Sequence, residues 1–304
     1  MVFSQWEDKC NRGDLNQLLE TILSTSNSET DIFDNTELNE KREKVFEDNQ
    51  FVVMSGYTVE YNYVEYSYEY VKKGKEKEPN REDRVGEYSA KIIVFKKQEK
   101  LYFLIDKSYS NKTLTNLRKM MNYSGKGEIV EHRFSGLKSD IFIWTLYRLL
   151  KHKNNPIDNQ GLMKLETLVG FMGETEDKLA AISGAGRRVI DLLTTLLFLF
   201  ENRNISKVEL TIDYAREKFK IIMGERSFID VDIRGSLINN IVAMDEKINC
   251  EILLKTFNDV IPLYIISFSN HIDNKTWTPT INKRFFKDIG KDITAEIRKL
   301  SKEI

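Results

Sequence analysis

The chain has 304 residues, of which 41% are hydrophobic and 31% charged, so it has enough apolar material for packed cores and is not a disordered chain. Its 46 basic and 47 acidic residues nearly cancel, which excludes a protein that coats nucleic acid or an acidic membrane with its whole surface. The two cysteines, Cys10 and Cys250, lie far apart and predict reduced thiols in the cytoplasm. The first residues lack the apolar core of a signal peptide, and the most apolar window, 189–200, is about half the ~20 residues that a bilayer needs. We therefore expect a soluble cytoplasmic protein that does not span a membrane.

Residues 1–50 are predicted to form an N-terminal helix and an acidic linker. Asp14 is a helix-capping residue type, and the apolar residues of 15–23 fall on one helical face. The polar run 24–43 has no periodicity and predicts a loop or linker.

Residues 51–153 are predicted to form a first domain of roughly ββββαβα order. Tyrosines and valines alternate on one parity over 57–63 and on the other over 64–70, which predicts a bulge or a break between Tyr63 and Val64. The other predicted elements are a hairpin of strands 88–96 and 101–106, a helix over 113–123, a strand over 128–134 and a helix capped by Ser139 that runs to His152.

Asn154-Asn155-Pro156 marks the predicted boundary to a second domain, 157–304. Three consecutive alternating segments predict an antiparallel meander, and a long amphipathic helix closes the chain. The fold class is therefore α+β, with two mixed parts. The elements predicted after the boundary are an apolar element of undecided type at 162–171, a core helix at 189–201, strands at 207–214, 218–223 and 227–233, helices at 237–244 and 250–257, a strand at 260–268 and a helix at 281–304.

One segment has the composition of an anion-binding site. Glycines permit close backbone approach, the start of the expected core helix offers unpaired N–H groups, and two arginines can clamp an oxyanion. The spacing is not that of a P-loop, and a plain flexible turn explains the same glycines. The candidate phosphate- or anion-binding residues are Ser183, Gly184, Gly186, Arg187 and Arg188.

Carboxylates on the predicted meander give an alternative, a metal-dependent nuclease or phosphoesterase that uses Asp213, Asp230 and Asp232. The alternation explains these residues more simply, because it places an acidic, a basic and an acidic row on one solvated face, where they pair across strands. The chain also lacks the motifs of serine hydrolases, dinucleotide enzymes and zinc sites. We therefore lean toward a protein that is not an enzyme and predict no cofactor or resident metal; a divalent metal belongs only to the alternative.

Two further features concern partners. The tyrosines of 57–70 alternate with Glu60, Glu65 and Glu69, which would repel phosphates, so core packing or a protein-binding surface is favoured over a base-stacking platform. The last helix carries an apolar stripe for docking on the protein body or on a partner, and a basic start. This start supplies the candidate nucleic-acid contacts Lys283, Arg284 and Lys287, although a solvated face is the simpler interpretation.

Together these features favour a non-enzymatic binding or regulatory subunit that contacts DNA, RNA or another phosphate-bearing ligand. The composition and the lack of housekeeping motifs further suggest a component of a microbial antiviral defence system, which binds another protein or itself.

Overall fold

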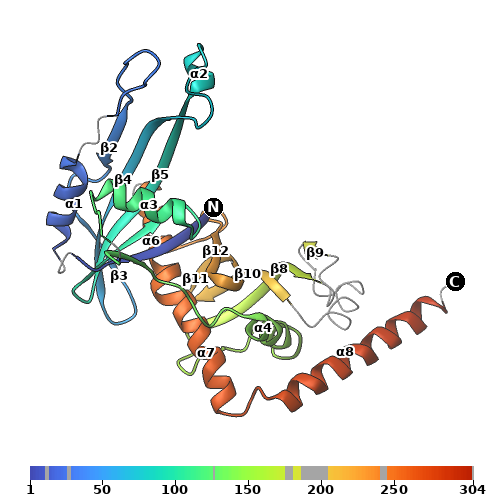
Figure 1. The fold of residues 1–304 in the computed structure, drawn as a ribbon. Coiled ribbons are helices and arrows are strands. Elements are labelled where there is room, and N and C mark those ends of the chain that lie inside the picture. Colours follow the sequence, from blue (N-terminus) through green and yellow to red (C-terminus); the bar gives the residue numbers. More distant parts are fainter. Residues whose placement is uncertain are drawn as a thin grey trace. The chain divides into compact units, whose positions relative to one another are not determined.

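A computed structural model describes residues 1–10, 14–25, 29–125, 127–174, 181–185, 205–239 and 245–302. The fold is of the predicted α+β class, with antiparallel sheets and helices (Figure 1). The chain forms two compact units, Val2–His132 and Arg133–Ile304, the latter including Met1. The division falls before helix α4 (Ser139–Lys151), whereas the sequence placed it at Asn154–Pro156.

The unit Val2–His132 is built on an antiparallel sheet in the order β2–β4–β5–β6–β1–β7, with β3 also beside β4. The N-terminal segment that the sequence set apart contributes to this sheet, because β1 pairs with both β6 and β7. The expected hairpin of β5 and β6 is confirmed, and its two-residue turn is Gln98-Glu99. The strands are β1 (Val2–Asp8), β2 (Glu40–Lys44), β3 (Gln50–Val53), β4 (Thr58–Val71), β5 (Val85–Lys97), β6 (Lys100–Ile105) and β7 (Ile129–Glu131).

Helices α1 (Leu15–Ser24) and α3 (Asn111–Met120) supply apolar residues to a core with one face of this sheet. As predicted, Asp14 caps α1, and its carboxylate accepts a hydrogen bond from the backbone N–H of Gln17. The short helix α2 (Arg81–Arg84) lies between β4 and β5. The core includes Trp6, Leu18, Ile22, Val64, Tyr66, Ile92, Val94, Phe103, Leu117 and Met120.

Strand β4 runs without a bulge, contrary to the break expected between Tyr63 and Val64. Its register with β5 is continuous from Glu60 opposite Lys96 to Val71 opposite Val85. The parity changes because the strand is covered on different faces along its length. Tyr61 and Tyr63 contact Phe46 on one face, whereas Val64 and Tyr66 join the core under α1 and α3 on the other.

The second unit contains the sheet β9–β8–β10–β11–β12, and its last three strands confirm the predicted meander. Helix α4 packs on β8 and β10. Ser139 does not cap α4, since the N-cap is Lys138; the Ser139 hydroxyl instead accepts a hydrogen bond from the N–H of Ile205. The strands are β8 (Met163–Glu174), β9 (Ala181–Ala185), β10 (Ile205–Tyr214), β11 (Glu217–Gly224) and β12 (Phe228–Val231).

The strand predicted at 260–268 is wrong. Helix α6 (Asp245–Lys255), a π-helical turn (Thr256–Val260) and helix α7 (Ile261–Asp273) form one continuous helix. Its packing outweighs the β-propensity of the isoleucines, because Tyr264 is fully buried and its hydroxyl lies 2.5 Å from that of Thr145 on α4. Among the described residues this helix is long and apolar enough to cross a membrane, but 61% of its apolar window is buried, as in the core helix of a soluble protein.

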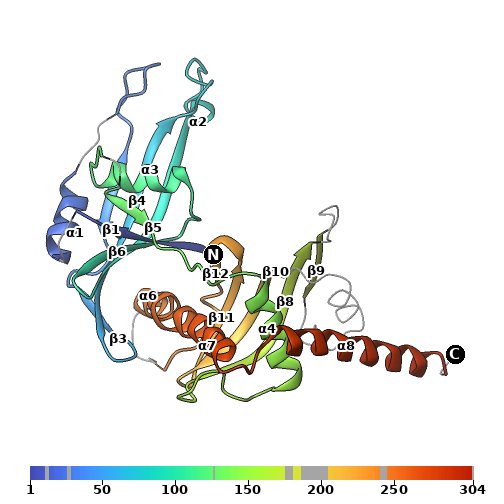
Figure 2. The same ribbon diagram turned by 60° about the horizontal axis from the view of Figure 1, so that its bottom comes forward.

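The long C-terminal helix is confirmed as α8 (Pro279–Leu300), capped by the Thr278 hydroxyl. Its first half lies beside α4 in Figure 2, and the rings of Phe285 and Tyr147 are 5.5 Å apart. The core helix predicted at 189–201 lies outside the described residues. Of the helix predicted at 237–244, Leu237 instead forms a β-bridge with Lys218, and 240–244 lie outside the described residues.

Candidate functional site

The structure describes only the beginning of the anion-binding candidate. Ser183 and Gly184 lie in β9, an antiparallel partner of β8, where they are opposite Met172 and Phe171. These two residues therefore belong to a strand, whereas a loop before a helix was expected. Gly186, Arg187 and Arg188 lie outside the described residues.

The carboxylates of the meander pair with lysines on the neighbouring strands. Lys220 Nζ on β11 lies 3.2 Å from Glu209 Oε1 on β10 and 3.0 Å from Asp232 Oδ2. These hydrogen bonds raise the pKa of Lys220, and the ammonium group lowers the pKa of Asp232. Lys218 bonds to Glu166 on β8, with 2.8 Å between Nζ and Oε1. This acidic, basic, acidic order is the cross-strand pairing that the sequence pattern predicts.

The three aspartates of the enzyme alternative are held in different surroundings. Asp232 bonds to Lys220, Asp230 pairs with the N-terminal ammonium of Met1, and Asp213 lies opposite Lys218 in the β10–β11 register. Within the described ranges, no three His, Cys, Asp or Glu side chains come together as ligands for a metal ion. The arrangement thus offers charge pairing, and it lends no support to a divalent-metal centre at these residues.

Helix α8 carries a segregated basic face. At 3.6 residues per turn, five of its six cations fall within an arc of about 100° and a length of about 22 Å, with no carboxylate inside the arc; the sixth, Lys299, lies among the acidic residues. The five cations in the arc are exposed, and among the described residues only Lys291 of these makes an ion pair, with Asp288. We call this set the basic stripe; it consists of Lys283, Arg284, Lys287, Lys291 and Arg298.

The other faces of α8 have separate roles. Asp288, Asp292 and Glu296 recur every four residues beside the basic stripe. The apolar face is buried as far as Ile293 and fixes the helix to the second unit; beyond it Ile297 is 47% exposed. The stripe was missed as a whole because charges of both signs alternate along the sequence. A helical projection of Pro279–Leu300 would have placed its five cations on one arc.

A polar hollow of about 320 Å³ lies on the sheet of the first unit, on a face that Ser67 of β4 and Ser89 of β5 share. These two small side chains are directly opposite each other, and longer charged side chains surround them. Its charges are largely paired, since Lys91 lies 3.6 Å from Glu65 and Lys41 lies 2.7 Å from Glu43. The lining includes Lys41, Glu65, Glu87, Lys91 and Asp106.

The tyrosines of β4 occupy both faces of the strand, as core packing predicts. Tyr61, Tyr63 and Tyr66 are buried, and Tyr68 and Tyr70 are partly buried against the core under α1 and α3. No protein-family model matches the sequence, and no curated protein matches it. The chemistry of the chain itself therefore carries the functional argument.

Proposed function

We propose that this chain is a non-enzymatic nucleic-acid-binding protein that holds the phosphate backbone along the basic stripe of α8. The observation that carries the proposal is the segregation of charge, because five exposed cations line one face of about 22 Å without an intervening carboxylate. That length corresponds to about six base-pair steps of 3.4 Å. A nearly neutral protein can bind a polyanion through such a local face.

The apolar face of α8 favours this partner over a membrane surface. An amphipathic helix on a membrane inserts its apolar side chains among the lipids. In α8 the apolar side chains Phe285, Phe286, Ile289 and Ile293 are already buried in the protein. The five cations of the basic stripe remain exposed on one arc, separate from the exposed Asp292 and Glu296. The arginines of 183–188 are a proposed second site for phosphate. The regulatory role in a defence system stays a prediction.

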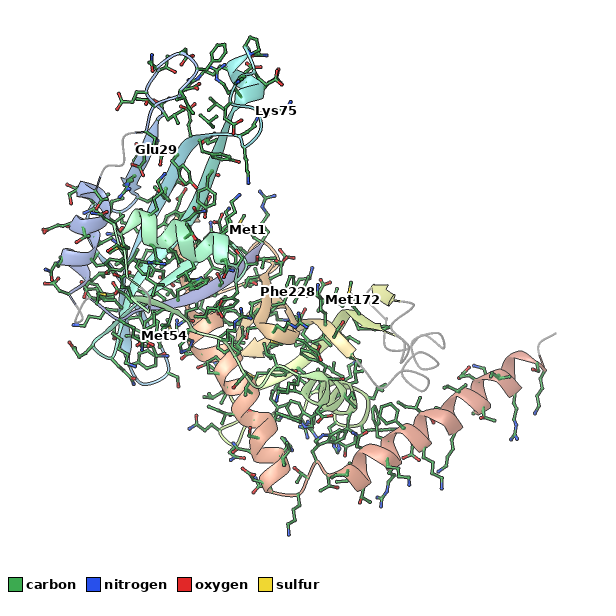
Figure 3. The ribbon with its side chains drawn as sticks, viewed as in Figure 1. Met1, Glu29, Met54, Lys75, Met172 and Phe228 are labelled. Atoms are coloured by element: carbon green, nitrogen blue, oxygen red, sulfur yellow. The ribbon has the colours of Figure 1, made fainter. Side chains whose placement is uncertain are left out.

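The test measures binding to a 20-base-pair DNA duplex and to RNA of the same length between 50 and 200 mM salt. The triple variant Lys283→Gln, Arg284→Gln, Lys287→Gln should weaken binding and reduce the slope of log K against log salt by about 0.9 for each phosphate of duplex DNA that is no longer neutralised. The matched control, Lys73→Gln, Lys75→Gln, Lys77→Gln, removes the same charge from exposed positions between β4 and α2; Lys75 is labelled in Figure 3. Equal reductions in both variants, or no binding by the unmodified chain, would overturn the proposal.

A further inference from the structure

Four tyrosines form a continuous aromatic array on one face of the sheet in the first unit. Tyr66, Tyr68 and Tyr70 are alternate residues of β4, and Tyr88 lies opposite Tyr68 on β5. The ring centroids are 5.6 Å apart for Tyr66 and Tyr68, 6.1 Å for Tyr68 and Tyr70, and 5.2 Å for Tyr68 and Tyr88. We call this array the tyrosine face.

Four cations and three carboxylates lie near the rings of the tyrosine face, and the Tyr66 hydroxyl donates a hydrogen bond to Glu40. Glu65 and Glu69 alternate with the tyrosines in sequence and therefore point to the opposite face of the sheet, where Glu65 lines the polar hollow. Other elements supply the charges beside the rings. Lys119 Nζ is 4.4 Å from the ring centroid of Tyr68, the Arg42 guanidinium is 5.3 Å from that of Tyr66, and Lys107 and Lys112 are each 5.9 Å from that of Tyr88.

Some of these charges are already balanced, and Lys112 is not. Lys119 pairs with Glu29, which is labelled in Figure 3, Arg42 pairs with Glu40, and Lys107 pairs with Asp106. Lys112 is exposed and makes no ion pair with the residues that the structure describes. Glu65 and Glu69 therefore do not face the rings, and Lys112 leaves one unbalanced positive charge beside Tyr88.

The outer end of the tyrosine face is accessible. Beyond α3, β4 and β5 continue toward α2 (Figure 1), and Tyr68 and Tyr70 are only partly buried. The ring of Tyr70 packs against the backbone of β5 at Gly86, where an added Cβ would be 2.9 Å from the Cζ of Tyr70. Nearer α3, Tyr88 and Asn116 are more than nine-tenths buried, and the side chain of Asn116 interacts with the hydroxyls of Tyr88 and Tyr68.

We propose that Tyr68 and Tyr70, the partly exposed rings of the tyrosine face, stack unpaired bases, so that the nucleic acid this chain binds is single-stranded. Aromatic side chains stack on any base, and nearby cations hold the adjoining phosphates. Successive rings are about 6 Å apart, and they come from alternate residues of one rigid strand. This inference rests on the proposed binding of nucleic acid and adds the class of its ligand.

The test compares two probes of equal charge, a 20-nucleotide oligothymidine and a 20-unit abasic deoxyribose phosphate strand, by fluorescence anisotropy with the full chain. Since stacking contributes about 5- to 150-fold in affinity per base, the chain should bind oligothymidine at least about fivefold more tightly. Tyr70→Leu should reduce this ratio and Tyr70→Phe should retain it. Tyr57→Leu, the matched control, changes a tyrosine outside the array that also lies beside a lysine, and it should leave the ratio unchanged.

The outcomes separate this inference from the proposed function. Equal affinity of the unmodified chain for both probes, or an unchanged ratio in folded Tyr70→Leu, would overturn the tyrosine face as a base-binding site. In either case the proposed function stands if the α8 triple variant still weakens both probes equally. Failure of the chain to bind either probe overturns the tyrosine face as a base-binding site, and it overturns the proposed function as well if the DNA duplex is not bound either. Circular dichroism of each variant identifies a loss of affinity that is caused by unfolding.

Discussion

The Nε atom of Arg84 donates a hydrogen bond to Asp31 Oδ2 at 2.7 Å, and both side chains are almost completely buried, at 1% and 0% exposure. The guanidinium also donates to the backbone carbonyl of Glu78 and to the carboxylate of Asp34, and it lies 4.3 Å from the ring centroid of Phe33. One side chain of α2 therefore joins the loop before β2 to the loop between β4 and α2.

Replacing Arg84 should be strongly destabilising, because Asp31 would remain buried without its main partner. We expect Arg84→Met to lower the free energy of unfolding by about 3–5 kcal/mol, measured by urea denaturation. Arg81→Met is the control, since Arg81 is 36% exposed and lies 4.0 Å from the same carboxylate. Its replacement should cost about 1 kcal/mol or less. Similar costs in the two variants would contradict a special role for the buried pair.

The attachment of α8 depends on its buried apolar residues. Ile289→Ala removes a side chain that is 1% exposed and should cost about 2–5 kcal/mol, measured by thermal or urea unfolding. Ile297→Ala changes the same residue type further along the helix, where it is 47% exposed, and should cost well under about 1 kcal/mol. A large effect at Ile297 would mean that a partner or a further segment covers the second half of α8.

The second unit should lose stability in mild acid because of two histidines. Burial lowers the pKa of His271 and of His152 below 6.5, and the positive charge of Arg148 lowers both further. The folded state then binds fewer protons than the unfolded state, so this contribution is complete above pH 6.5 and falls as the pH drops toward the folded pKa.

Urea denaturation at pH 7.5 and 5.5 measures this loss of stability, and His271→Gln should reduce it. His271 Nδ1 lies 2.6 Å from the Thr276 hydroxyl, so glutamine keeps a polar group at the same position. His132→Gln provides a comparison in the other unit, where burial also lowers the pKa of the histidine. If His271→Gln is as acid-sensitive as the unmodified chain, another group causes the loss.

The arginines at 187 and 188 should add to the binding by α8 if the segment 183–188 binds phosphate. Arg187→Ala with Arg188→Ala should reduce the slope of log K against log salt by about 0.9 for each phosphate of duplex DNA that these side chains neutralise, in addition to the effect of the α8 triple variant. Arg216→Ala with Arg234→Ala removes two exposed arginines of the same unit and serves as the control. An unchanged slope in the 187/188 variant would remove this segment from the interface.

Sequence patterns correctly predicted the helices and strands that have one solvent-exposed face and one buried face. The meander of β10, β11 and β12 alternates strictly, and Asp14 begins α1 with a local hydrogen bond. Prediction failed where tertiary packing decides. The apolar run after Val260 suits either a strand or a helix, and its burial against Trp144 and Thr145 of α4 accompanies the helix.

The candidate sites show the same limit. The basic stripe of α8 is encoded locally, and the spacing of Lys283, Lys287 and Lys291 reveals it once a helix is assumed. The surroundings of the tyrosine face are not local, because Arg42, Lys112 and Lys119 come from β2 and α3. The residues on either side of Tyr68 in the sequence, Ser67 and Glu69, point to the opposite face of the sheet, so they do not reveal what surrounds its ring.

Strand β4 imposes an unusual rule on tolerated substitutions. Polar replacements should be rejected at the odd positions Val59, Tyr61 and Tyr63, and then at the even positions Val64 and Tyr66. A saturation mutagenesis map would thus show a two-residue rhythm that changes phase between 63 and 64, although no residue is inserted there. Inserting or deleting one residue between 63 and 64 would place all five side chains on the same face of the sheet. One of the two apolar layers that cover β4 would then lose its contacts with the strand.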